Sequence, residues 1–508
     1  MGVVGVLGVG VLAVPAASGT TDTVTTCASS GPGSLPAVVA AAGAGDTVSF
    51  ALSPPCSTIT VPTPVDIGLN LSIDGPGAGV LAVASDSGDV FDVSANVTAA
   101  TISGLTVEDS TVGIDNAGTL AVTGTTVTEN GSNAGGGIVN TGTVTVTDAT
   151  LSQNTVGVGD GLGGGGLSND KGTATVTDSL VSDNAAANGA NGGGLYNHDG
   201  SLSITDTTVT ANSTGTGDGG GIYNDGGTVT ITDSSLLHNI ATDGAGGGLD
   251  NAKGTANVAD TTLSGNNAYY SSDGGGIANA ATLTVTNSTL AHNAARYGGG
   301  VGGNLFTSGT STVSATIFSG GIPDDCDGPL VDGGYSLADD SSCSLTATTD
   351  QPDTAAGLDP AGPQDNGGDT ETIGLEPSSA AVSAVSSATL CSTPDQRGVA
   401  RPTPCDTGAV QFTEPPPAIT SPDSASGTVG TAFSFDVTTT GSPPPTIKKK
   451  GRLPKGLRLG PPAHGSRTIV GTPGKAGVYP LTLEAFFGSG QAKIVVTEPF
   501  TITVDPAG

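Results

Sequence analysis

The sequence predicts an all-β protein in which a coil of stacked parallel strands, a parallel β-helix, is followed by a small β-sandwich. Three observations predict this. A phrase recurs about every 27 residues, apolar side chains alternate with a period of two inside it, and composition and charge change near residue 414. The chain contains 83 glycines and no tryptophan. Such a composition indicates disorder only when no period is present, so the period favours stacked structural units.

The repeat consists of two alternating phrases. The first is G-G-G-[I/L/V]-x-N and the second ends in an asparagine; each occurs seven times, at steps of 24 to 30 residues. Within "TVTITDSSL", Val229 and Ile231 alternate with threonines, which predicts a strand with one buried face. Helix formers are scarce, and each copy holds two or three short strands separated by Gly/Asn/Asp turns. One copy therefore corresponds to one turn of a parallel β-helix.

Neighbouring turns must match because one turn cannot bury its apolar face alone. We expect Ile222, Leu249 and Ile277 to touch in one inner column. We also expect a structural role for the asparagines that close the second phrase, because asparagine tolerates left-handed backbone and its amide can bond to the same residue one turn away. These are Asn212, Asn239, Asn266 and Asn293.

The chain before the repeats is expected to contain a leader and a cap. Residues 1–19 have an apolar run followed by small residues, as in a secretory signal peptide. The basic segment that begins such a peptide is missing, and we expect the true start codon to lie upstream. The alternative is that these residues form an apolar first strand. Residues 20–54 are expected to form an N-terminal cap, with a short helix and a strand between Gly33 and Phe50, because the open edge of a coil favours aggregation. Residues 55–322 have room for nine or ten turns of the coil.

Six cysteines and an acidic composition restrict the cellular setting and the partners. The cysteines are predicted to form three local disulfides in an exported protein, because their number is even and no metal-site spacing is present. The pairs are Cys27 with Cys56, Cys326 with Cys343, and Cys391 with Cys405. Formal net charge is −32, so binding to nucleic acid is not expected, since it requires clustered Lys and Arg. No apolar run after the leader is long enough to span a bilayer. We also expect the protein to be a monomer.

The repeats resemble right-handed parallel β-helix proteins of the pectate-lyase-like superfamily. The glycine phrase is also similar to repeats of polymorphic outer-membrane proteins, and "TVTTCASSGPGSLPAVVAAAGAGDTVSFAL" is similar to the N-terminal cap of bacterial surface β-helix proteins. The segment "DQRGVARPTPCDTGAVQF" (395–412) resembles the signature of the choice-of-anchor Q group, although Gln411 stands where that group usually has an acidic residue. The resemblance implies a right-handed coil, with a C-terminal cap and anchor-Q-like segment at 323–413.

Residues 414–508 are predicted to form a separate sandwich. Strand-like alternation with turn residues every 8–12 positions is typical of such folds. The segment "LPKGLRL…IVGTP…GVYPLTLEA" resembles the Ig-like modules appended to bacterial surface proteins. The preceding "IKKKGR" is unusually basic, and we expect Lys448 to Lys455 to be a loop that either grips an anionic wall polymer or is simply solvated.

A column of acidic residues is the candidate metal site. One aspartate recurs at the same place in successive copies of the second phrase, so the aspartates would lie about one strand spacing apart. They would either bond to their own backbone as Asx turns or bind Ca²⁺, which is the one candidate cofactor. The column comprises Asp148, Asp178, Asp206, Asp233 and Asp260; a weaker set before the glycine phrases comprises Asp160, Asp218, Asp243 and Asp273.

Two tyrosines are the candidate carbohydrate contacts. Tyr196 and Tyr223 follow the glycine phrases one turn apart. If their rings are exposed they can bind a sugar; the alternative is plain stacking between turns. No catalytic residues can be assigned from the sequence. Lyases of this fold use Ca²⁺ with an Arg or Lys base, but Lys171 and Lys253 stand in turns, and no cluster of Asp with a basic partner has converging spacing.

The sequence therefore favours a non-catalytic secreted or cell-surface protein, a rigid rod for adhesion or glycan binding. Its partner would be an extracellular polysaccharide or cell-wall polymer, with the sandwich as a spacer or attachment module. The alternative is a polysaccharide lyase or glycoside hydrolase of the same fold. An autotransporter passenger is disfavoured because no run of about ten amphipathic membrane strands follows the sandwich.

Overall fold

The computed structural model is nearly all-β and divides into two units, Met1–Gln411 and Phe412–Gly508. It describes residues 19–132, 135–157, 163–187, 189–270, 272–413, 417–441, 445–461, 465–487 and 494–507. The expected signal peptide lies almost entirely outside these residues, as does Asp160.

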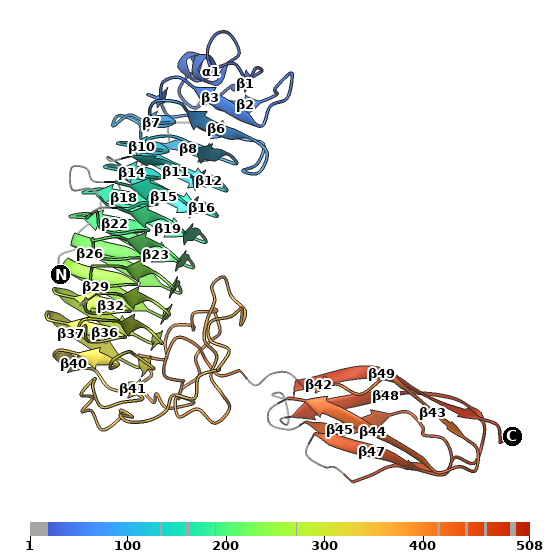
Figure 1. The fold of residues 1–508 in the computed structure, drawn as a ribbon. Helices are drawn as coiled ribbons and strands as arrows, with labels where there is room; N and C mark the ends of the chain where they lie inside the picture. The colour runs from blue at the N-terminus through green and yellow to red at the C-terminus, as the bar shows by residue number, and fades with distance from the viewer. Residues whose placement is uncertain are drawn as a thin grey trace, which may run out of the picture. The chain divides into compact units, whose positions relative to one another are not determined.

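The first unit is a parallel β-solenoid of about 11 turns, which confirms the predicted class (Figure 1). Strands of successive turns pair in parallel and form three sheets. The largest sheet has 22 strands, arranged as two columns that merge where β26 and β29 continue through the bend.

The 22-stranded sheet contains β1 (Thr21–Val24), β2 (Thr47–Phe50), β4 (Val65–Ile67), β5 (Ser72–Asp74), β7 (Phe91–Val93), β8 (Ala100–Ser103), β10 (Ile114–Asn116), β11 (Thr119–Thr123), β14 (Ile138–Asn140), β15 (Thr143–Thr147), β18 (Leu167–Asp170), β19 (Thr173–Thr177), β22 (Leu195–His198), β23 (Ser201–Thr205), β26 (Ile222–Thr232), β29 (Leu249–Ala259), β32 (Ile277–Asn279), β33 (Thr282–Thr286), β36 (Leu305–Thr307), β37 (Thr310–Ser314), β39 (Cys326–Asp327) and β40 (Leu330–Asp332).

The 12-stranded sheet contains β3 (Thr58–Val61), β6 (Ala82–Ser85), β9 (Thr106–Glu108), β12 (Thr126–Thr128), β16 (Thr150–Ser152), β20 (Leu180–Ser182), β24 (Thr208–Thr210), β27 (Ser235–Leu237), β30 (Thr262–Ser264), β34 (Thr289–Ala291), β38 (Ile317–Ser319) and β41 (Leu337–Ala338). The 7-stranded sheet contains β13 (Gly131–Ser132), β17 (Thr155–Val156), β21 (Ala185–Ala186), β25 (Ser213–Thr214), β28 (Ile240–Ala241), β31 (Asn267–Ala268) and β35 (Ala294–Ala295).

The inner columns of apolar side chains hold the turns together. Ile222 lies in register with Leu249, which lies in register with Ile277, and all three are fully buried. The predicted column is therefore confirmed. A large apolar side chain contributes about 1.5–3 kcal/mol when it is fully buried, so the stacked columns are the main source of stability of the solenoid.

Two rows of buried asparagines run along the turns. In the first asparagine ladder, each side-chain amide donates to the amide oxygen of the next turn, as Asn239 does to Asn266 at 3.0 Å. The first ladder comprises Asn130, Asn154, Asn184, Asn212, Asn239, Asn266, Asn293 and Asn304. The second asparagine ladder closes the glycine phrase and comprises Asn116, Asn140, Asn169, Asn197, Asn224, Asn251 and Asn279.

The left-handed backbone falls one residue earlier than the sequence suggested. The residue before each first-ladder asparagine from Asn130 to Asn293 has positive φ, for example His238 at 55°. Two separate constraints explain why the repeated phrase contains glycines. Gly219 has φ of 66°, and a Cβ on Gly221 would lie 2.6 Å from the carbonyl oxygen of Gly248 in the next turn. Neither position accepts a side chain without strain.

Both ends of the solenoid are covered. Helix α1 (Leu35–Ala41) and strand β2 are present where a helix and a strand were expected, and the Cys27–Cys56 disulfide joins the loops beside them. At the other end the parallel pairing continues past Gly320 through β39, β40 and β41, one turn further than the expected boundary at 322. These last strands are short and lack the apolar alternation, so the pattern could not identify them.

Residues 340–411 are largely irregular and fold back along the solenoid (Figure 1). The Cys326–Cys343 and Cys391–Cys405 disulfides, both as predicted, close loops in this region. The side-chain amide of Gln396 donates to Ser234 O at 2.9 Å, and Thr262 Oγ1 donates to Gln396 Oε1 at 2.7 Å. The signature-like segment therefore attaches the irregular region to the turns.

The second unit is an Ig-like sandwich of two four-stranded sheets. One sheet contains β42 (Ala418–Ile419), β44 (Phe433–Thr440), β47 (Ser466–Gly471) and β46 (Leu457–Leu459), and the other contains β43 (Ser424–Thr428), β49 (Ile494–Asp505), β48 (Gly477–Phe487) and β45 (Thr446–Lys450). The core includes Val437, Ile469 and Phe500.

The expected basic loop is partly a strand, because Ile447 alternates inward and β45 pairs with β48. Lys450 Nζ lies 2.5 Å from Glu484 Oε1. No helix in the described part of the chain has the length and apolar character needed to cross a bilayer.

Candidate functional site

The aspartate column lies in the bend between the 22-stranded and 12-stranded sheets. All five aspartates have positive φ, between 46° and 52°. In other turns the equivalent position is Gly124, Asn287 or Ala315, also with positive φ. Asp, Asn and Gly adopt this conformation most readily, so the backbone alone explains the residue type. The five aspartates of the column are Asp148, Asp178, Asp206, Asp233 and Asp260.

The irregular region divides this column into two parts. Asp148, Asp178 and Asp206 line an open groove of about 710 Å³, together with Asp369 and Glu371 from the irregular region. We call this the acidic groove. The sequence offered no sign that Asp369 and Glu371 would join these aspartates, because at least 131 residues separate them from His238 and the other lining residues of the turns.

The other two aspartates of the column lie beneath the irregular region. Asp260 is buried, and its Oδ1 accepts a hydrogen bond from Arg401 Nη2 at 2.7 Å. Its carboxylate is therefore neutralised by arginine, and the five-member Ca²⁺ column expected from the sequence is not formed as one site. Burial and the charges of Asp260 and Asp206 raise the pKa of Asp233 to about 7.

The acidic groove attracts positive charge. Burial and the charges of Asp178 and Asp369 raise the pKa of Asp206. The described residues that line the groove include His238 but neither Lys nor Arg. A lyase base of the Arg or Lys type is thus missing there. The groove contains paired carboxylates, which is the chemistry that a glycoside hydrolase requires.

The weaker acidic set has a structural explanation for two members. Asp218 Oδ1 accepts the backbone N–H of Ala245 at 2.8 Å, and Asp273 Oδ1 accepts that of Val301 at 3.1 Å. Each bond joins a loop to the next turn, so these two carboxylates connect neighbouring turns of the solenoid. Asp243 is exposed.

The predicted carbohydrate pair is buried. The rings of Tyr196 and Tyr223 stack with centroids 5.7 Å apart and planes at 4°, and the residues are 3% and 8% exposed. Burial, the largest cause, and nearby aspartates raise the pKa of Tyr196 to about 12. The rings are therefore not exposed for a sugar, and of the two alternatives the geometry favours plain stacking between turns.

A second group of three tyrosines includes two exposed members. Tyr269 and Tyr270 follow β31, and Tyr297 follows β35 one turn later. The ring centroids of Tyr269 and Tyr297 are 6.1 Å apart, those of Tyr270 and Tyr297 are 6.0 Å apart, and both pairs are stacked. Tyr270 and Tyr297 are 61% and 65% exposed. We call these three residues the tyrosine patch.

A shallow pocket adjoins the tyrosine patch. It has a volume of about 410 Å³, and Arg296, Tyr297, Ile322 and Pro323 line it. Arg296 Nε donates to Asn267 Oδ1 at 3.0 Å, which holds the exposed guanidinium beside the rings. Aromatic faces with a few polar groups are typical of small-ligand sites. The signal in the sequence was the 27-residue spacing of Tyr270 and Tyr297.

The basic residues singled out as catalytic candidates form surface ion pairs. Lys171 Nζ lies 2.8 Å from Asp170 Oδ1, and His198 Nδ1 lies 2.7 Å from the same oxygen. Lys253 Nζ lies 2.6 Å from Asp225 Oδ1. Both lysines are largely exposed, and such pairs contribute little to stability.

Comparisons with known proteins identify the second unit. The family model He_PIG (Putative Ig domain) matches residues 416–505. No curated protein matches the chain. Among solved structures, "Chimeric titin Z1Z2 functionalized with a KLER exogenous peptide from decorin" is 18% identical, covering 19% of this chain and 100% of that chain with a TM-score of 0.16. The titin M3 domain is 13% identical, covering 18% and 97%, with a TM-score of 0.15.

Proposed function

We propose that this protein is a non-catalytic extracellular or cell-surface protein whose solenoid contacts a neutral polysaccharide through the tyrosine patch. A rigid β-solenoid with an Ig-like module fits a structural or adhesive protein, and three disulfides are consistent with an extracellular location. The observation that carries the proposal is the exposure of the stacked rings of Tyr270 and Tyr297.

The chemistry of the patch suits a sugar ring. The apolar C–H face of a pyranose packs on an aromatic face, while Arg296 beside the rings supplies donors for hydroxyl oxygens. A pocket of about 410 Å³ lies within the range of small-ligand sites. An anionic polymer is disfavoured, because residues 1–414 carry five Lys/Arg against 41 Asp/Glu, a charge of −36.

The test is a glycan array probed with the full-length protein and with the double variant Tyr270→Ala/Tyr297→Ala. Loss of one aromatic ring costs about 1–3 kcal/mol in other ring-stacking sites, so loss of both rings should weaken the binding of neutral glycans at least tenfold. His292→Ala is the matched control, since His292 is an exposed ring at a left-handed position outside the patch. Equal binding by the double variant would contradict the proposal.

The acidic groove supports a second candidate, a glycoside hydrolase. Asp178, Asp206 and Glu371 line one open groove, and hydrolysis of a glycosidic bond requires two carboxyl groups on either side of it. Incubation with neutral and acidic polysaccharides, with and without Ca²⁺, distinguishes the two candidates. Release of reducing or unsaturated ends, abolished in Asp206→Asn, would replace the adhesive proposal with an enzymatic one.

A further inference from the structure

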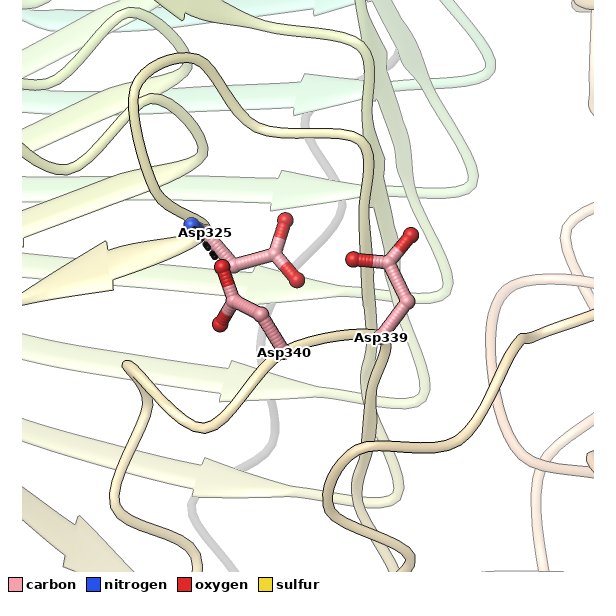
Figure 2. Close-up of side chains that lie close together, drawn as sticks. All are labelled: Asp325, Asp339 and Asp340. Carbon is pink, nitrogen blue, oxygen red and sulfur yellow. Dashed lines mark hydrogen bonds between the residues drawn. The ribbon is translucent and has the colours of Figure 1, made fainter.

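Three aspartates outside the groove lie close together at the C-terminal end of the solenoid. Asp325 precedes Cys326 at the start of β39, and Asp339 and Asp340 follow β41. Their carboxylate oxygens include one set of three atoms, one per residue, that all lie within 4.8 Å of one another. Figure 2 shows the three side chains turned toward one another from neighbouring stretches of chain.

Asp325 occupies the place of the next asparagine in the first asparagine ladder. Asn293 donates to Asn304 at 2.9 Å, and Asn304 Nδ2 then donates to Asp325 Oδ1 at 2.6 Å. The backbone N–H of Gly321 donates to the same oxygen at 2.8 Å. A carboxylate thus ends a row of neutral amides, although an amide would satisfy the same donors.

The second oxygen of Asp325 has no hydrogen-bond partner. The residue is completely buried, and its Oδ2 is one of the few buried side-chain oxygens in the described part of the chain without a partner. A buried polar atom that is left unpaired is strongly unfavourable. The carboxylate of Asp325 lies close to those of Asp339 and Asp340, which accept hydrogen bonds but cannot donate them when ionised.

The neighbouring carboxylates are held in place by donors from the chain. Asp339 Oδ2 accepts Ser319 Oγ at 2.8 Å and Gly320 N at 2.9 Å. Asp340 Oδ2 accepts the backbone N–H of Asp325 at 3.0 Å. None of the ion pairs in the described ranges involves these three aspartates. Their mutual repulsion is therefore not offset by a Lys or Arg side chain.

We propose that Asp325, Asp339 and Asp340 bind a calcium ion that closes the C-terminal end of the solenoid. Ca²⁺ takes six to eight oxygen ligands at about 2.3–2.6 Å, so two oxygens up to about 4.8 Å apart can share one ion. Mg²⁺ demands a stricter and smaller octahedron, and Zn²⁺ sites are usually built from His and Cys. Water and backbone oxygens would complete the coordination.

The location of the three aspartates indicates the structural role of a bound ion. It would connect the segment from Ser319 to Asp325 with the segment that follows β41, beside the Cys326–Cys343 disulfide. The first segment also contains Ile322 and Pro323, which line the pocket beside the tyrosine patch. The proposal itself does not depend on glycan binding.

The experiment is calcium titration of the full-length, EDTA-treated protein by isothermal calorimetry, with thermal unfolding measured in parallel. Asp325→Asn is the key variant, because an asparagine there continues the ladder and should preserve the fold. Asp327→Asn is the control, since Asp327 is exposed two residues away and changes the charge equally. We expect the variant to lose one bound Ca²⁺, or at least tenfold in affinity, and to lose the Ca²⁺-dependent rise in Tm.

Two outcomes would overturn the proposal. If Asp325→Asn binds Ca²⁺ with the stoichiometry and affinity of the unmodified protein, the ion sits elsewhere, for example in the acidic groove. If the unmodified protein binds no Ca²⁺ and Asp325→Asn is equally or more stable, a proton shared between Asp325 and Asp339 relieves the repulsion between the carboxylates. Neither result depends on whether the protein binds a glycan.

Discussion

Replacing Asn239 with alanine should remove one rung of the first asparagine ladder and destabilise the solenoid by about 3–5 kcal/mol. The Asn239 side chain takes part in four buried hydrogen bonds: its Nδ2 donates to Val209 O at 2.9 Å and to Asn266 Oδ1 at 3.0 Å, and its Oδ1 accepts from the backbone and side-chain N–H groups of Asn212 at 3.0 Å. Val209 O and the backbone N–H of Asn212 lose their side-chain partner, and each buried unsatisfied group costs about 1–3 kcal/mol.

The assay is thermal unfolding by circular dichroism, combined with hydrogen exchange of the turns around position 239. With an unfolding entropy of about 2.1 cal/mol/K per residue, a loss of this size lowers the Tm of a unit of this length by roughly 4–6 °C. Exchange should accelerate first in the turns next to the substitution, because each turn contacts only its neighbours. Asn257→Ala, on the outer face of β29 and outside both ladders, is the control.

A change in Tm below about 1 °C for Asn239→Ala would refute this reasoning. It would mean that water replaces the amide without loss, and that the apolar columns alone determine the stability. Equal destabilisation by Asn257→Ala would refute it as well, because the effect would then arise from strand propensity and not from the ladder.

Two further predictions concern the irregular region. Arg401→Met leaves the buried carboxylate of Asp260 without its arginine partner, which should destabilise the attachment of the irregular region by about 3–5 kcal/mol. Limited proteolysis within 360–400 should then accelerate. The second substitution Asp260→Asn removes the unpaired charge and should restore most of the resistance to proteolysis. Burial raises the pKa of Asp233 to about 7 in the folded state, from the ordinary value of 3.8 expected in the unfolded chain. The folded protein then binds more protons than the unfolded one between about pH 4 and 7, so this residue lowers stability as pH rises through that window. Asp233→Asn should flatten the pH dependence of Tm there, and an unchanged slope would contradict the shifted pKa.

The repeat explains why so much of the fold could be predicted from the sequence. Ile222, Leu249 and Ile277 recur at nearly constant spacing because the same inner position must be filled in every turn. The five aspartates recur for the same reason, because each occupies the same left-handed backbone position in its turn. Periodicity therefore predicts whatever each turn shares with its neighbours.

Features that depend on distant segments could not be predicted in this way. The acidic groove and the pairing of Asp260 with Arg401 arise where a segment without a repeat folds back on the turns. The burial of Tyr196 could not be read from its outward position on a strand, although the ring of Tyr223 in the next turn stacks on it. The aspartates near Cys326 and Cys343 had a local signal, because the flanks "PDDC" and "ADDSSC" bring carboxylates to a predicted disulfide.

The central claim, that the solenoid holds a neutral glycan on stacked tyrosines without cleaving it, is tested most directly by calorimetric titration of one array-selected oligosaccharide. The account predicts saturable binding by the full-length protein, at least tenfold weaker binding by Tyr270→Ala/Tyr297→Ala, and an oligosaccharide recovered intact afterwards. Unchanged affinity in the double variant, or a shortened oligosaccharide after the titration, would contradict it.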